Sequence, residues 1–195
     1  MPRKPRAQSQ SGCYHFIARG VSKKKIFHRE KDFKFYLELL EQYQDVFGLK
    51  IHHYCLMTNH THLLLKSEEL FSLSRFGHYV QRRYAYYYCK TYRWSGQVFQ
   101  NRFISIPIEK DSYLLECARY IERNPLRATL VKTLTDYPWS SYHFYANGMQ
   151  DNLIEPSPMF LDLGDSQIKR QALYREYLNT QRPYEELVDR ALMKS

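Results

Sequence analysis

The order of apolar and polar positions predicts a mixed domain of strands and helices. Cys13 to Ala18 reads CYHFIA, a short apolar and aromatic strand, and a basic loop from Gly20 to Lys25 follows it. Apolar residues then recur at helical spacing behind Asp32, which can cap a helix, and Gly48 can end that helix. The chain is therefore expected to begin with a strand, a loop and an amphipathic helix.

Two strands joined by a tight turn are predicted next. Leu49 to Met57 and His60 to Lys66 are both rich in strand-forming residues, and Thr58-Asn59 between them suits a two-residue turn. The pattern indicates a β-hairpin.

One strand and five helices are predicted after this hairpin. Pro125 is expected to end one helix at the residue before it, because the proline ring disfavours helical geometry there. The strand is Gln97 to Ile108, and the helices are Phe71 to Trp94, Asp111 to Asn124, Leu126 to Val131, Ser166 to Asn179 and Tyr184 to Met193.

Charge is distributed unevenly along the 195 residues. Residues 1–150 carry 23 Lys and Arg against 12 Asp and Glu, whereas residues 151–195 carry 6 against 8, so the net charges are +11 and −2. Neutralising phosphates releases counterions, so this asymmetry favours a polyanionic partner such as nucleic acid. Solubility alone is the alternative explanation. Residues 1–12, MPRKPRAQSQSG, are expected to form a disordered basic arm.

The sequence lacks the features of a membrane or secreted protein. No run approaches the roughly 18 apolar residues of a membrane span, and the basic start leads into Gln and Ser rather than the apolar core of a signal peptide. The four cysteines form no C-x-x-C pair, so we expect reduced, mostly buried thiols. A cytoplasmic protein without membrane contact is the expectation.

Two pairs of residues are candidates for chemistry. His60 and His62 are separated by one residue, so on a strand they project from the same face and can share one metal ion. Tyr120 and Asn124 lie at i and i+4, away from the apolar stripe of their helix. Each pair alone has a simpler explanation, because two histidines can sit on a wet sheet face and Tyr120 is one of 18 tyrosines.

The segment HYCLMTNHTHLLLK resembles the signature of the IS200-like single-tyrosine transposases of the HUH class, written M-P-N-H, a hydrophobic residue, then H. YHFIARGVSKKKIF resembles that family's first strand and basic loop, GQVFQNRF its central strand, and RYIERNPLRATLV followed by YPWSSY the segment carrying its nucleophile. The REP-associated tyrosine transposases, which handle short palindromic hairpins, are the most similar branch. The matching motifs cover residues 13–145.

The resemblance implies a fold and a set of site residues. The fold would be α+β, with a ferredoxin-like central antiparallel sheet, helices on its faces, a transposase domain over residues 13–147 and a C-terminal helical extension over 148–195. His60 and His62 would be metal ligands and catalytic, Tyr120 the nucleophile, and Asn124 a further metal ligand. Thr58 stands where the family has proline, and Thr61 where it has a hydrophobic residue. Both departures are strand-compatible and affect fine geometry rather than chemistry.

The implied activity is metal-dependent cleavage and joining of single-stranded or hairpin DNA through a 5′-phosphotyrosine. Mixed nitrogen and oxygen ligands suit Mg²⁺ or Mn²⁺. A hairpin-binding protein without catalysis and an RNA-binding module are the alternatives, and the protein would be a monomer or a homodimer. Candidate DNA contacts are Arg19, Lys23, Lys24, Lys25, Arg82, Arg83, Arg102, Arg123 and Arg127.

The tyrosines near Arg82 and Arg83 allow two interpretations. They could stack DNA bases beside these arginines, or they could fill the core while the arginines are solvated. Trp139 to Tyr142 is interpreted as a packed corner rather than a contact surface.

Overall fold

Four strands form one antiparallel sheet in the computed structural model, which describes residues 6–180 of the chain. Their order across the sheet is β2-β3-β1-β4, and one helix follows β1 and another follows β3. This βαββαβ connectivity is ferredoxin-like, which confirms the predicted fold class. The elements are β1 (Cys13–Arg19), α1 (Glu30–Phe47), β2 (Lys50–Met57), β3 (His60–Lys66), α2 (Leu70–Tyr92) and β4 (Ile104–Ile108).

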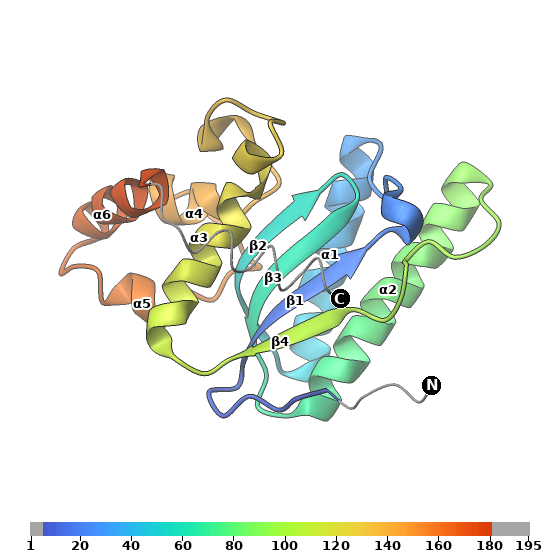
Figure 1. The fold of residues 1–195 in the computed structure, drawn as a ribbon, viewed down its shortest axis with the longest axis horizontal. Coiled ribbons are helices and arrows are strands. Elements are labelled where there is room, and N and C mark those ends of the chain that lie inside the picture. The colour runs from blue at the N-terminus through green and yellow to red at the C-terminus, as the bar shows by residue number, and fades with distance from the viewer. Residues whose placement is uncertain (1–5, 181–195) are drawn as a thin grey trace.

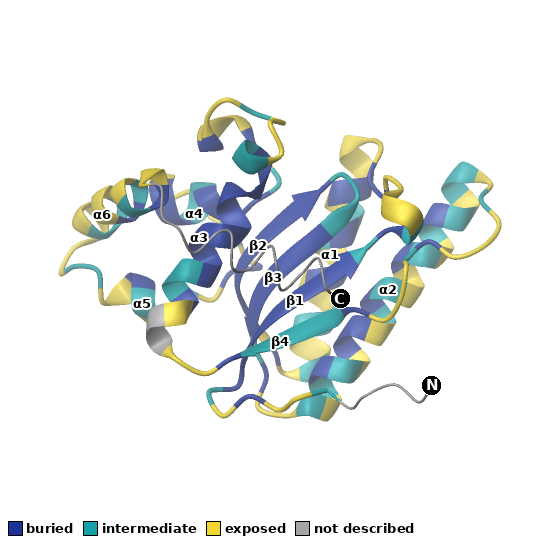
Figure 2. Ribbon diagram, viewed as in Figure 1, coloured by how far each residue is buried: buried dark blue, intermediate teal, exposed yellow. Residues whose placement is uncertain are grey.

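The sheet separates two layers of helices. Helices α1 and α2 cover one face, and α3 (Asp111–Arg127) crosses the other (Figure 1). Alternate residues of β1 serve the two layers, because Phe16 packs in the cluster that contains α1 and α2, while Ile17 packs with α3. Strands β1, β2 and β3 are almost wholly buried, whereas β4 at the edge is half-buried (Figure 2).

The tyrosines of α2 mostly belong to the core. Tyr84 and Tyr88 are buried, and the hydroxyls of Tyr87 and Tyr92 donate hydrogen bonds of 2.8 and 2.6 Å to the carboxylate of Asp32 on α1. These contacts join α1 to α2 on the sheet face opposite α3. For these four rings, core packing is therefore favoured over base stacking.

Helix α3 runs past Pro125, contrary to the predicted end at Asn124, and no separate helix spans Leu126 to Val131. Proline lacks the N–H that would have bonded to the carbonyl of Ile121. The side-chain Nδ2 of Asn124 donates to that carbonyl at 3.3 Å and to the Tyr120 carbonyl at 2.8 Å. The amide side chain thus satisfies helix carbonyls beside the proline.

The start of the described chain is held against the sheet, so the expectation of a disordered arm is wrong for residues 6–12. Ser9 and Ser11 donate from Oγ to the carbonyl of Ile108 at 3.3 and 2.5 Å, and the backbone N–H of Gln10 donates to Glu109. Residues 1–5 lie outside the described part.

The predicted strand from Gln97 to Ile108 is shorter in the structure, where β4 begins only at Ile104. Residues 97–103 still bond to the end of β1 through Gln100 but do not continue its ladder.

Short helices extend the domain beyond α3. Ser141 and Tyr142 are buried against β2, and the Trp139 carbonyl accepts from Leu56 N–H, in agreement with the predicted packed corner. The predicted helix from Tyr184 to Met193 lies outside the described residues. The remaining elements are η1 (Val21–Lys23), η2 (Leu134–Asp136), α4 (Tyr142–Asn147), α5 (Pro158–Leu161) and α6 (Gln167–Asn179).

The expectations for the cysteines and for membrane spans agree with the described residues. The four cysteines are free thiols, of which Cys13, Cys55 and Cys117 are buried. Within residues 6–180, every helix is too short or too polar to cross a bilayer.

Candidate active site

The imidazoles of His60 and His62 lie side by side at the start of β3. Residues 58 and 59 form the turn after β2, and the strand begins at His60 directly afterwards. Because side chains alternate along a strand, both rings face the α3 side of the sheet. Their centroids are 4.8 Å apart, so one ion can be reached from both rings.

Each of these rings uses Nδ1 in a side-chain hydrogen bond. His60 Nδ1 lies 2.6 Å from Asn59 Oδ1, and because a carbonyl oxygen only accepts, the imidazole donates. His62 Nδ1 lies 2.9 Å from Nε2 of His15, a buried residue of β1. Nε2 of each ring remains for a metal ion. Sequence reasoning missed His15, although a polar residue in the apolar strand CYHFIA is a signal for it.

All three imidazoles are held in the neutral form at neutral pH. Burial, followed by the charge of Arg19, lowers the pKa of His60 to about 4. Burial and the neighbouring His60 lower the pKa of His15 to about 3. Burial, followed by the charges of His60, His15 and Arg19, lowers the pKa of His62 well below its usual value. A neutral imidazole keeps a lone pair for metal coordination, so protons do not compete with an ion at neutral pH.

Tyr120 on α3 packs directly against this histidine cluster. Its ring centroid lies 5.7 Å from that of His62 and 5.8 Å from that of His15, both in edge-to-face geometry. The side chain is 3% exposed. Burial raises the pKa of Tyr120, while the charge and hydrogen bond of Arg127 and the charge of Arg19 act to lower it. The structure therefore brings the phenol and the predicted ligand pair together.

Asn124 lies one helical turn after Tyr120, as the i, i+4 spacing predicts. Its Nδ2 is directed to the backbone of α3, which leaves Oδ1 as the atom that can coordinate an ion. Among the described residues, no hydrogen bond joins Asn124 to His60 or His62. The i, i+4 spacing thus correctly placed the Asn124 side chain one turn beyond Tyr120 on α3.

The donor set fits a divalent ion. In the described part of the chain, no group of three or more His, Cys, Asp or Glu could hold a metal. The protein donors for an ion here would be two imidazole nitrogens and an amide oxygen, with water or substrate completing the shell. Such a mixed set suits Mg²⁺ or Mn²⁺.

Some of the predicted DNA-binding residues surround the site. Arg19 pairs with His60 across β1 and β3, and the Arg127 guanidinium carbon lies 5.0 Å from the centre of the Tyr120 ring. The exposed side chains of Lys23, Lys24 and Lys25 follow β1, next to the β2–β3 turn, where Asn59 Nδ2 donates to the Lys23 carbonyl at 3.2 Å. Arg102 is exposed before β4.

Other predicted DNA contacts lie elsewhere. Arg82 and Arg83 are exposed on α2, across the sheet from the histidines. Arg123 is buried and donates to the Leu178 carbonyl of α6 at 2.5 Å, which does not favour its predicted role as a phosphate contact. Its side chain instead caps the carbonyl end of α6, a position that favours a positive charge.

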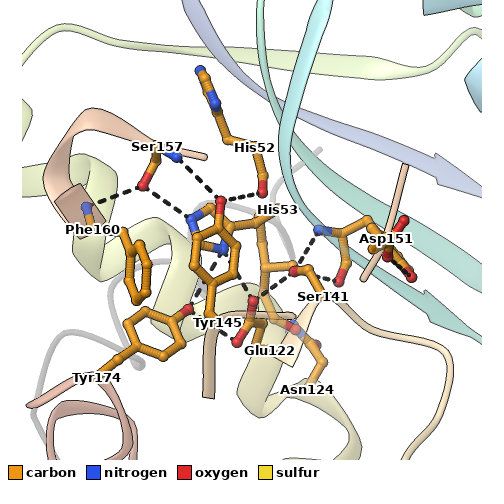
Figure 3. A network of polar contacts seen from close by, with 12 residues as sticks. His52, His53, Glu122, Asn124, Ser141, Tyr145, Asp151, Ser157, Phe160 and Tyr174 are labelled. Atoms are coloured by element: carbon orange, nitrogen blue, oxygen red, sulfur yellow. Dashed lines mark hydrogen bonds and ion pairs between the residues drawn. The ribbon is translucent and has the colours of Figure 1, made fainter. Parts of the chain in front are cut away.

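A buried polar network fixes the helix that carries Tyr120 (Figure 3). Glu122, fully buried, accepts hydrogen bonds from Ser141 Oγ at 2.5 Å and from the Tyr174 hydroxyl at 2.9 Å, and its carboxylate lies 3.0 Å from His53 Nδ1. These partners come from β2, the segment before α4, and α6. A buried carboxylate needs such partners to offset its lost hydration, so the network holds α3 at one position on the sheet.

The chain is similar to one protein family and to several solved structures. The family model described as "Transposase IS200 like" matches residues 8–124. Among solved structures, the chain is similar to a REP-associated tyrosine transposase bound to a REP hairpin, with a TM-score of 0.65 and 16% identity over 80% of this chain and 93% of that one. It also matches a putative transposase from Deinococcus radiodurans, with a TM-score of 0.43 and 18% identity over 63% and 97% of the two chains. No curated protein matches it.

Proposed function

The chain belongs to the IS200-like transposase family, and from that membership we infer that it cuts and rejoins single-stranded or hairpin DNA with Tyr120 as the nucleophile. One observation carries the inference. The Tyr120 ring lies against His62, and His62 lies beside His60, so a phosphate near the imidazole pair would be near the phenol. The structural relative bound to a REP hairpin supports DNA as the partner.

Three side chains are suited to hold the required ion. His60 and His62 would bind it through Nε2, because Nδ1 of each ring is already engaged, and Asn124 would add Oδ1. Bound there, Mg²⁺ or Mn²⁺ would offset the charge that builds up on the scissile phosphate.

Tyr120 Oη would attack phosphorus and form a new O–P bond. The bond from phosphorus to the 3′ oxygen of the preceding nucleotide breaks, and that oxygen leaves with the bonding electrons. The phenolic proton is released to solvent, and the departing oxygen takes one up, which yields a 5′-phosphotyrosine and a free 3′-OH. Arg127, beside the phenol, would stabilise the phenolate as the proton leaves.

The covalent intermediate would also permit joining. The phosphotyrosine bond is a phosphoester like the one that was broken, so a 3′-OH of another strand can displace Tyr120 without an external energy source. Cleavage and strand transfer would thus use the same residues in opposite directions.

Adduct formation tests the proposal. The purified chain would be incubated with a labelled DNA hairpin and Mn²⁺, and the covalent product mapped by mass spectrometry. Tyr120 should carry the adduct, Tyr120→Phe should abolish it, and Tyr113→Phe should keep it, because that exposed tyrosine lies about two turns before Tyr120 on the same helix.

Other outcomes of this experiment would contradict the proposal. An adduct that persists in Tyr120→Phe would assign another nucleophile. Tight hairpin binding without an adduct under any divalent metal would support a binding protein without catalysis, and preference for a matched RNA hairpin would support an RNA-binding module. Light scattering on the same samples would decide between a monomer and a homodimer.

A further inference from the structure

Pro125 interrupts the backbone hydrogen bonds of α3 at the turn that follows Tyr120. Any other residue at this position would donate its N–H to the carbonyl four residues earlier, which is that of Ile121. Proline has no N–H, and its ring also crowds that carbonyl. Pro125 and Ile121 are both buried, so little water can reach the carbonyl. The Ile121 carbonyl therefore needs a donor from a side chain.

The Asn124 side chain supplies this donor. Its Nδ2 lies 3.3 Å from the Ile121 carbonyl oxygen and 2.8 Å from the Tyr120 carbonyl oxygen. Because a carbonyl oxygen only accepts, the amide must present its NH₂ group to both, and Oδ1 is turned away from them. Asn124 is 9% exposed, and within residues 6–180 no hydrogen bond reaches Oδ1. A buried amide oxygen without a donor is suited to a cation.

Asn124 lies on the face of α3 that carries the proposed nucleophile. Tyr120, Asn124 and Arg127 are spaced at i, i+4 and i+7, so they share one side of the helix. The Tyr120 ring packs against His62, and the Arg127 guanidinium carbon lies 5.0 Å from the centre of that ring. The helix continues through this turn, because the N–H of Ala128 donates to the Asn124 carbonyl at 2.9 Å. The amide that compensates for the proline is therefore the one proposed as a metal ligand.

Contacts on other sides of α3 hold the helix in place, so it tolerates the proline. Glu122 is fixed by the buried network, and Arg119 Nε donates to the Tyr177 carbonyl at 3.2 Å. Arg123 donates to the Leu178 carbonyl at 2.5 Å. A locally costly backbone arrangement persists where surrounding contacts determine it, and such places are common at functional sites.

We propose that Pro125 is a positioning residue for the metal site. Because it withholds a backbone N–H, it ties the Asn124 amide nitrogen to the helix and keeps Oδ1 available to an ion. In Pro125→Ala, the new N–H would donate to the Ile121 carbonyl, and the amide would be free to adopt other rotamers. A ligand that is correctly oriented only part of the time lowers the apparent affinity by that fraction. The inference rests on the proposed function, because it assumes an ion shared by Asn124 and the imidazole pair.

Metal binding in the absence of DNA tests this role. Isothermal titration of Mn²⁺ would compare the wild type with Pro125→Ala, which should bind about three- to tenfold more weakly, as expected when one of a few staggered rotamers is competent. Asn124→Ala should also bind Mn²⁺ more weakly than the wild type. In the double variant, the proline substitution should add no further loss, because there is then no amide to orient.

Pro107→Ala is the matched control. Pro107 of β4 pairs with Tyr14, a residue of β1 that packs on the side of α1 and α2. Side chains of directly opposed residues project from the same face of a sheet, so Pro107 lies on the far face from α3. Its substitution should leave the Mn²⁺ affinity of the wild type unchanged.

A second measurement needs neither metal nor DNA. In protein labelled with ¹⁵N-asparagine, NMR would follow the side-chain amide of Asn124, identified by the signal that Asn124→Ala removes. Its order parameter should be lower in Pro125→Ala than in the wild type, which reports faster and wider motion of the amide. Loss of fold stability alone would not produce this local change.

The results separate this inference from the proposed function. Equal amide mobility in the wild type and Pro125→Ala, or equal Mn²⁺ affinity, would overturn the role of Pro125 even if Tyr120 still forms its adduct. A further loss of affinity when Pro125→Ala is added to Asn124→Ala would show that the proline acts through other residues, which also overturns it. Absence of both Mn²⁺ binding and any adduct in the wild type would overturn the proposed function and this inference with it.

Discussion

His15 Nε2 lies 2.9 Å from His62 Nδ1, in a contact between two buried imidazoles on neighbouring strands. One nitrogen must carry the hydrogen and the other must accept it. If His62 binds an ion through Nε2, its Nδ1 is the donor and His15 is the acceptor. Such a partner fixes the orientation and tautomer of a metal ligand. His15 is therefore a positioning residue for the proposed metal site.

His15→Ala should weaken metal binding. Loss of a hydrogen-bond partner behind a metal ligand typically reduces affinity about 10–100-fold. Isothermal titration of Mn²⁺ into the DNA-free protein would measure the effect. His78→Ala, an exposed histidine of α2, should bind Mn²⁺ as the wild type does. Unchanged affinity in His15→Ala would show that His62 is oriented by other contacts.

Arg127→Ala should slow formation of the Tyr120 adduct. The Arg127 guanidinium contacts the Tyr120 ring and hydrogen-bonds to the phenol, and its charge acts to lower the pKa of Tyr120. We expect a decrease of about 10- to 100-fold, on the scale of one charge-assisted interaction. Single-turnover kinetics with saturating hairpin would measure it, and Arg127→Lys should recover part of the rate. Equal rates in all three proteins would remove Arg127 from the mechanism.

Tyr174→Phe should destabilise the fold through Glu122. The substitution removes the 2.9 Å hydrogen bond to a fully buried carboxylate, at a cost of about 1–3 kcal/mol in the free energy of unfolding. Urea denaturation would show a lower midpoint with an unchanged slope. Tyr86→Phe, at an exposed tyrosine of α2, should change the free energy by less than about 0.5 kcal/mol. Similar midpoints for both variants would contradict the role of the network.

Asp32 should make stability depend on acid pH. Burial acts to raise its pKa, but hydrogen bonds from Tyr92, from the backbone of His28 and Arg29, and from Tyr87 lower it overall. Its pKa in the folded state is therefore below the unfolded value of about 3.9. The stabilisation is fully present above that value and is lost as pH falls through the folded pKa.

Urea midpoints measured from neutral to acid pH test this linkage. The wild type should lose more stability on acidification than Asp32→Asn, whose side chain does not titrate. Glu38→Gln, at an exposed carboxylate of α1, should follow the wild type. Parallel curves for the wild type and Asp32→Asn would show that other carboxylates dominate the acid response.

Gly77→Ala should strain the contact between α2 and the segment before β4. A methyl group at position 77 would overlap the ring of Phe103, and overpacking of this kind costs about 1–3 kcal/mol. Differential scanning calorimetry should show a lower Tm, and Phe103→Leu in the same chain should recover part of the loss. If the double variant is less stable than the sum of the two single variants predicts, ring overlap is not the cause.

Strand and helix periodicity predicted which candidate residues share a face, whereas their assignment to one site came from the family resemblance. The alternation in β3 placed His60 and His62 on one face, and helical spacing placed Tyr120 and Asn124 together on α3. Both predictions use only local geometry, which is set by backbone dihedrals and is independent of the rest of the fold. The ferredoxin-like order of strands followed from the family resemblance and is confirmed by the structure.

The sequence could not give the features that depend on contacts between distant segments. The partnership of His15 with His62 requires the pairing of β1 with β3, and the burial of Arg123 requires the packing of α6 on α3. Helix α3 continues through Pro125 because the Asn124 side chain donates to the carbonyl of Ile121, a contact that helix propensity does not predict. The late start of β4 at Ile104 likewise depends on its register with β1.

The partners of Glu122 also determine when the domain can be completed during synthesis. His53 is translated before the carboxylate, but Ser141 and Tyr174 emerge from the ribosome later. Until both residues are present, packing of α3 on the sheet would bury the Glu122 carboxylate without two of its hydrogen-bond donors. A ribosome that stalls before Tyr174 would thus release a chain in which α3, the helix that carries Tyr120, lacks part of its anchorage.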